Sequence, residues 1–171
     1  MGTLDDAPSF VIQDIYGGSP QLFSVVFAAN ALALVVLGQV NGRMVGRVRL
    51  RLRFRVGLIT NCLSSLALLV GVAAGLRGMA PVLVPFFCVV ASQGLILPNG
   101  TALVMQSHPE AAGTASALVG FTQFFLGAMV APLVGIGGSR TALPLTIAMV
   151  VAAVAALAVM LLTVRRSGPE L

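Results

Sequence analysis

Charged side chains are scarce in this sequence. Of its 171 residues, 9% are charged and 58% are hydrophobic, whereas a typical soluble domain carries about 25% charged residues. So little charge cannot cover the surface of a water-soluble fold of this size. The composition therefore argues against a soluble helical protein, which stays as the alternative, and favours a chain whose solvent is lipid.

The groups that carry out catalysis or hold metals are also missing. The sequence shows no arrangement of Ser, His and Asp, no cluster of metal ligands and no phosphate-binding glycine loop. His108 is the single histidine and lies with Glu110 in a short loop between two apolar windows. We interpret this loop as solvated, and a titrating switch is the weaker alternative. Cys62 and Cys88 lie inside apolar segments and are expected to be small buried side chains. We therefore expect no enzyme, no catalytic residue, no metal site and no cofactor.

Long apolar segments are what the sequence has instead. Five windows lack Asp, Glu, Lys, Arg and His, and each reaches the roughly 20 residues that an α-helix needs to cross about 30 Å of hydrocarbon. They are 21–41, 56–76, 81–105, 113–136 and 141–164. Because backbone groups in lipid must be paired within the segment, these windows predict helices. The expected fold is an all-α integral membrane protein, with residues 1–171 forming one membrane domain of five transmembrane helices.

The arginines predict the orientation. All ten basic residues are arginine, and six of them fall between the first two windows. These six are Arg43, Arg47, Arg49, Arg51, Arg53 and Arg55. Since basic loops stay in the cytoplasm, this loop and the C-terminus are expected inside and the N-terminus outside. The arginines are interpreted as topology determinants at the lipid headgroups, and a nucleic-acid-binding strand is a weaker alternative because the flanking spans hold the run at the membrane.

Uncharged polar side chains inside the spans are the candidates for function. Such groups face either other helices, where they supply modest hydrogen-bonding glue, or a water-filled cavity. Candidates for a cavity wall are Asn30, Gln39, Gln93, Asn99 and Gln123. Pro98 and Pro132 are candidates for helix breaks, because proline removes a backbone donor and clashes with the preceding turn. Gly71 and Gly75, at four-residue spacing, predict a close helix–helix approach.

No window contains a carboxylate. A proton-coupled transporter normally needs an ionisable group within the membrane. If the chain belongs to such a transporter, the proton site is expected elsewhere.

Four motifs, in order along the chain, resemble a known family. They are Ser9 through Gly42 (with Gln39-Val-Asn-Gly at its end), Gly94-Leu-Ile-Leu-Pro-Asn-Gly-Thr-Ala-Leu, Ala111-Ala-Gly-Thr-Ala-Ser-Ala-Leu and Ala131-Pro-Leu-Val-Gly. Together they are similar to the Bcr/CflA drug-resistance branch of the major facilitator superfamily. The loop Gly42-Arg43 to Gly46-Arg47 resembles the superfamily's loop motif but lacks its aspartate.

The resemblance implies proton-driven export of amphipathic drugs across the plasma membrane by twelve helices in two halves. In that frame the five spans are similar to helices eight to twelve, so the chain is expected to be the C-terminal portion of a transporter whose other half is a missing partner. The alternative is a non-transporting remnant or helper that packs against another membrane protein.

Overall fold

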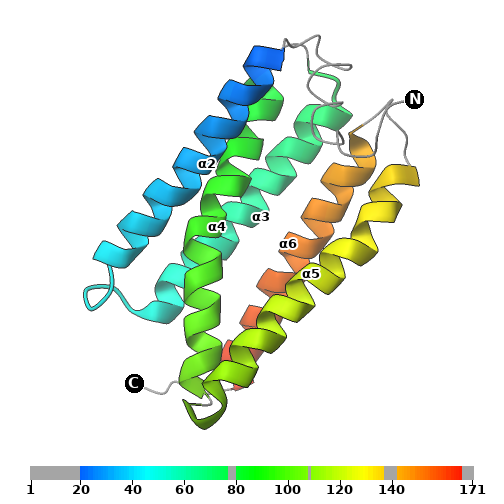
Figure 1. Ribbon diagram of the computed structural model, residues 1–171. Coiled ribbons are helices and arrows are strands. Elements are labelled where there is room, and N and C mark those ends of the chain that lie inside the picture. The colour runs from blue at the N-terminus through cyan, green and yellow to red at the C-terminus, as the bar shows by residue number, and fades with distance from the viewer. Residues whose placement is uncertain (1–19, 77–79, 108, 137–141, 167–171) are drawn as a thin grey trace.

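Five long helices make up nearly all of the described part of the chain. The computed structural model describes residues 20–76, 80–107, 109–136 and 142–166 (Figure 1). The helices are α2 (Pro20–Arg43), α3 (Leu50–Ala73), α4 (Ala80–Ser107), α5 (Ala112–Ile136) and α6 (Leu143–Arg166), with a short 3-10 helix, η3 (Pro109–Ala111), before α5. Each long helix is apolar and long enough to cross a membrane. The prediction of an all-helical membrane protein with five spanning helices is confirmed.

The helices start and stop close to the charge-free windows, with one exception. α2 begins at Pro20, where the missing N–H of proline costs nothing. α3 begins at Leu50, well before the window that starts at residue 56. Its first turns therefore contain Arg51, Arg53 and Arg55, so part of the arginine run is helix rather than loop.

The helices run up and down the bundle, so that alternate connections lie at opposite ends (Figure 1). α4 packs against both α2 and α3, and α6 packs against the other side of α3. The turn between α2 and α3, η3 and the end of α6 all lie at one end (Figure 1). We call this the basic end, because it carries Arg43 through Arg55 and the last helical residues, Arg165 and Arg166.

Two glycines allow α4 to approach its neighbours closely. A Cβ on Gly94 would lie 2.9 Å from both the Gly38 nitrogen and the Leu34 oxygen of α2. A Cβ on Gly71 of α3 would lie 2.8 Å from the Pro81 oxygen of α4. Both obstacles are backbone atoms, which cannot rotate away. The helices meet backbone to backbone, as small residues permit in membrane bundles.

Gly75, the expected partner of Gly71 in a close approach, has a different role. It follows the end of α3 with φ +59°, a left-handed conformation that glycine adopts without strain. The Leu76 nitrogen donates to the Gly71 oxygen, and the Gly75 nitrogen donates to the Val72 oxygen. This is a Schellman cap. The prediction that Gly75 packs against another helix was wrong, because the residue terminates its own.

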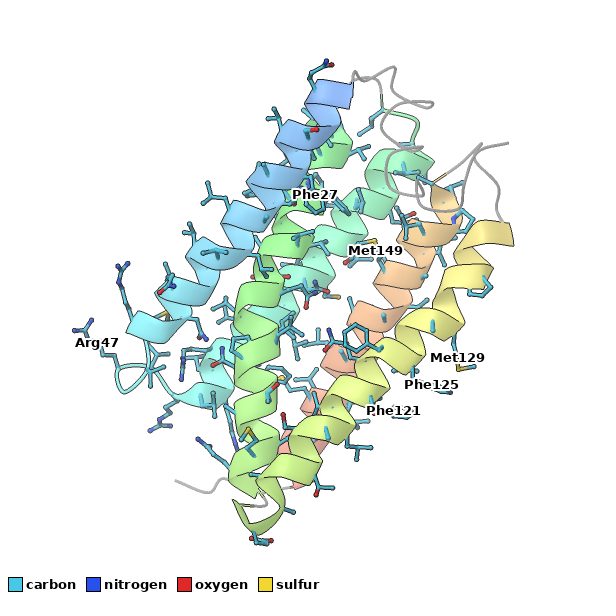
Figure 2. All side chains as sticks on the ribbon, in the orientation of Figure 1. Phe27, Arg47, Phe121, Phe125, Met129 and Met149 are labelled. Atoms are coloured by element: carbon cyan, nitrogen blue, oxygen red, sulfur yellow. The ribbon has the colours of Figure 1, made fainter. Side chains whose placement is uncertain are left out.

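α5 packs less tightly than the other helices. None of the residues in its most apolar window, Ala112–Met129, is buried, whereas 39% of the corresponding α3 window is. Phe121 and Phe125 stack with ring centroids 5.6 Å apart. These rings and Met129 extend from the outer edge of α5 (Figure 2). The outward face of α5 is thus apolar and uncovered within the described part of the chain.

Replacing Gly94 by Ala is expected to push α2 and α4 apart. The added methyl would meet backbone on α2, and overpacking of this kind costs about 1–3 kcal/mol. Gly38→Ala is the matched control, since a Cβ at Gly38 has no neighbour within 4 Å. Thermal unfolding of the purified variants in detergent should show a lower midpoint for Gly94→Ala alone. Equal midpoints would contradict the close approach.

Candidate functional site

Three polar side chains from three helices meet at the basic end of the bundle. Asn41 lies near the end of α2, Arg53 near the start of α3 and Asn99 in the second half of α4. The Arg53 Nη1 donates to the Asn41 Oδ1 at 3.0 Å and to the Asn41 backbone oxygen at 3.2 Å. The Asn99 Nδ2 donates to the same Oδ1 at 2.8 Å. We call these three residues the polar node, and Asn41 is its shared acceptor.

Helical geometry explains why one arginine of the run is buried. The sequence from Arg47 to Arg55 alternates basic and apolar residues, which in a strand would place all arginines on one face. In a helix, Arg51 and Arg55 share one face and Arg53 lies on the other. Arg53 is 6% exposed, whereas Arg51 and Arg55 are exposed. Because α3 begins at Leu50, the alternation sends a single guanidinium inward.

The buried guanidinium is bound by neutral groups. Both acceptors of Arg53 belong to Asn41, an uncharged side chain and its backbone. The Arg53 Nε is buried and has no hydrogen-bond partner in the described part of the chain. Hydrogen bonds to charged groups are worth about 1.5–3 kcal/mol, more than neutral ones. The node therefore ties α2 to α3 strongly while leaving the positive charge uncompensated.

Asn99 ties α4 to the same point. It is 2% exposed, and its Nδ2 also donates to the Leu95 oxygen at 2.7 Å, one turn earlier in its own helix. Pro98 precedes it and lacks the N–H that would bond the Gly94 carbonyl. α4 continues through Pro98, as α5 does through Pro132, whose side chain is exposed. The polar node therefore joins the arginine turn to one of the two places in α4, at Pro85 and Pro98, where proline leaves the backbone ladder without a donor.

A second polar contact joins α3 to α4 farther from the basic end. The Asn61 Nδ2 donates to the Ser92 Oγ at 2.9 Å, and the Ser92 Oγ donates to the Val89 oxygen at 2.6 Å. Ser65, one turn along α3 from Asn61, is 1% exposed, and its Oγ lacks a partner in the described part. Asn61 and Ser92 thus form a second polar link between α3 and α4.

The five cavity-wall candidates do not gather at one place. Asn99 is in the polar node. Asn30 is buried on α2, with its Nδ2 bonded to the Val26 oxygen at 2.8 Å and its Oδ1 unpaired in the described part. Gln93 is half-buried on α4, and Gln39 and Gln123 are exposed on α2 and α5. Whether these five line a substrate cavity stays a prediction.

The arginines occupy three kinds of position. Arg43 is the last residue of α2, where a basic side chain complements the helix dipole. Arg47 lies in the turn and points away from the bundle (Figure 2), and Arg49 is the residue before α3. All six except Arg53 are exposed. Their assignment to the lipid headgroups stays a prediction for those five, while Arg53 is an interior residue.

Sequence reasoning missed Asn41, the centre of the node. It is the last residue of the first charge-free window and directly precedes Gly42-Arg43, and it was not singled out among the polar residues of the spans. The signal that could have found it is spacing. Asn30, Ala33 and Asn41 are the three most buried of the α2 side chains that the structure describes, and their separations place them on one helix face.

Two curated relatives resemble this chain. It is 36% identical over 161 residues to an uncharacterised MFS-type transporter, YdgK, of Bacillus subtilis (strain 168). The matched segment covers 93% of this chain and 39% of the relative. It is 29% identical over 143 residues to a bicyclomycin resistance protein homolog of Haemophilus influenzae. This second matched segment covers 84% of this chain and 36% of the relative. The chain thus spans less than half the length of these relatives. No protein-family model and no solved structure matches it.

The node predicts different outcomes for two similar substitutions on α2. Asn41→Ala removes the acceptor of both Arg53 and Asn99 and should cost about 2–3 kcal/mol, because a buried charged donor loses its partner. Asn30→Ala, at a similarly buried asparagine whose hydrogen bond in the described part goes to Val26 of its own helix, should cost about 1 kcal/mol or less. Thermal or denaturant unfolding in detergent compares the two. If Asn41→Ala were no more damaging than Asn30→Ala, the node would not hold the helices together.

Proposed function

We propose that these five helices are part of a major facilitator superfamily transporter of the Bcr/CflA branch, which exports amphipathic small molecules from the cell. The observation that carries the proposal is the similarity to two transporter sequences along most of this chain. One of those relatives is described as a bicyclomycin resistance protein homolog, which supports drugs as the substrate class. The five apolar helices fit a membrane transporter.

The five helices correspond, in this proposal, to helices eight to twelve of the transporter. Both relatives are more than twice as long as this chain. Transporters of this superfamily have two halves of six helices, and transport requires one half to rock against the other around a shared site. α2 to α6 would then supply most of one half, and the other half would come from a longer chain or from a separate partner.

The arrangement suggests how the half moves. α2, α3 and α4 are joined by the polar node and by the close backbone contact at Gly94, so they would move as one unit. No residue of the described α5 window Ala112–Met129 is buried, and the outward face of that window is available for contact with helices beyond this chain. Asn30, Gln39, Gln93, Asn99 and Gln123 remain the proposed contributors to the substrate cavity.

Proton coupling, if present, would come from residues beyond these five helices. The spanning helices contain no carboxylate, and the one acidic side chain in the described part is Glu110 in η3. A carboxylate within the membrane is the usual proton carrier of a proton-driven transporter. The second candidate function, a helper that packs against another membrane protein, is favoured by one observation, namely the uncovered apolar face of α5.

Orientation gives the first test. Arginines gather at the basic end, and the positive-inside rule assigns that end to the cytoplasm of the cell. We expect a fluorescent protein fused after residue 171 to fluoresce, and alkaline phosphatase fused between α3 and α4 to be active. Between α2 and α3, on the proposed cytoplasmic side, an inserted fluorescent protein should fluoresce and an inserted alkaline phosphatase should be inactive. An active phosphatase in the arginine turn would overturn the proposed orientation.

Resistance gives the second test. The chain is expressed in bacteria that lack their own drug exporters, either alone or joined to the coding sequence of the first seven helices of the YdgK relative. We expect export of bicyclomycin or an amphipathic dye only from the joined form, with loss of export when a protonophore collapses the gradient. Asn99→Ala should reduce export, and exposed Arg47→Gln should leave it unchanged. A joined form that inserts but never exports would favour the helper function.

A further inference from the structure

The two prolines inside α4 lie in different surroundings. Pro85 and Pro98 each lack the N–H that would bond a carbonyl one turn earlier. After Pro85 the helix is packed on its neighbours, since the following turns hold several buried residues, Val89 among them. After Pro98, Asn99 is buried, but none of the side chains at 100–106 is. The buried part of α4 therefore ends directly after Pro98.

Close contacts hold α4 in place up to Gly100. A Cβ on Gly57 of α3 would lie 3.0 Å from both the Leu95 Cβ and the Ile96 Cγ1 of α4. A Cβ on Gly100 would lie 3.1 Å from the Phe54 Cε2 of α3. Together with the polar node and the backbone contact with α2, these approaches fix α4 against its neighbours on the N-terminal side of Pro98 and one turn beyond it.

The backbone of α4 is weakened over the same turn. Pro98 removes one hydrogen bond from the ladder. The Asn99 Nδ2 donates to the Leu95 oxygen at 2.7 Å, and the Thr101 Oγ1 donates to the Leu97 oxygen at 3.0 Å. Side chains that bond the carbonyl one turn earlier compete with the backbone N–H groups, and helices bend at such places. A bend in α4 is therefore least costly where its packing on α2 and α3 also ends.

α5 follows the part of α4 that lies beyond this turn. It meets α4 near the basic end of the bundle and diverges from it toward the other end (Figure 1). None of the residues in its window Ala112–Met129 is buried, whereas α6 packs against α3. A movement of α5 would thus break few buried contacts among the described residues.

We propose that Pro98 is a hinge, about which the last turns of α4 swing together with α5. The fixed part consists of α2, α3, α6 and α4 up to Gly100, and Asn99 anchors it beside the hinge through the polar node. The swing changes the separation of α5 from α3 at the end opposite the basic end. The hinge bends a continuous helix rather than interrupting it, and it does not depend on drug export.

Hydrogen exchange of the purified full chain in detergent, followed by mass spectrometry, tests the hinge. Amides of residues 99–104 should exchange faster than those of 88–92. P98A restores the missing donor and removes the ring clash, so it should slow exchange at 99–104 by about tenfold or more. P85A is the matched control and should leave exchange at 99–104 unchanged. No slowing by P98A, or equal slowing by P85A, would overturn the hinge.

Distances between spin labels distinguish a swing from simple fraying of the end of α4. In a background without the two cysteines, the pair V70C and M129C joins α3 to α5 at exposed positions. Its distance distribution should be broad in the otherwise unaltered chain and narrow in P98A. The control pair V25C and V70C joins two helices of the fixed part, also at exposed positions, and should be narrow in both.

Three outcomes of the distance measurement would contradict the proposal. A narrow distribution between α3 and α5 in the unaltered chain would show that α5 does not swing. Equally broad distributions for both pairs would show a bundle that is loose throughout, with no fixed part. A broad distribution that P98A leaves unchanged would place the movement somewhere other than Pro98.

Discussion

A buried guanidinium in an apolar bundle must find oxygen acceptors, and in this protein one asparagine supplies them. The Oδ1 and backbone oxygen of Asn41 accept from Arg53, and the same Oδ1 accepts from Asn99. The hydrocarbon of a bilayer offers no replacement for these acceptors. The rotation of α3 about its axis, the position of α2 beside it and the placement of α4 beyond Pro98 therefore depend on one another. The close approach at Gly94 brings α4 against α2 without any polar side chain.

The sequence predicts the helices well because lipid imposes a strict rule. A stretch of about 20 residues without charge has helix as its available state in a bilayer, and α4 and α5 accordingly follow their windows closely. The rule fails at the start of α3. Arg51, Arg53 and Arg55 were excluded from the span because they are charged, yet helix formation there requires only that each side chain find water, headgroups or an acceptor. The position of charged residues predicts where the hydrocarbon region ends. The helix can continue beyond that point, as α3 does from Leu50.

The candidate site was harder to predict, since an intramembrane amide can face a cavity or another helix with the same sequence signature. Asn99 was singled out and is in the node, but its partner Asn41 was not, because a contact across 58 positions has no local pattern. Gln39 and Gln123 are exposed, and nothing in their neighbours distinguishes a lipid-facing position from one that meets further helices. Gly75 shows a related limit: small-residue spacing does not distinguish a packing face from a helix terminus.

The order of the polar node along the chain has a consequence for biosynthesis. A nascent membrane protein emerges from its N-terminus, so Asn41 enters the bilayer before Arg53 and long before Asn99. When Arg53 of α3 is synthesised, its acceptor Asn41 on α2 is already in place. The two helices can therefore insert as a hairpin in which the guanidinium keeps its hydrogen-bond acceptor. α4 then closes the assembly with a neutral amide, whose late arrival costs little. Arg53, the charged donor of the node, thus follows its acceptor Asn41 by 12 residues, whereas the neutral donor Asn99 follows it by 58.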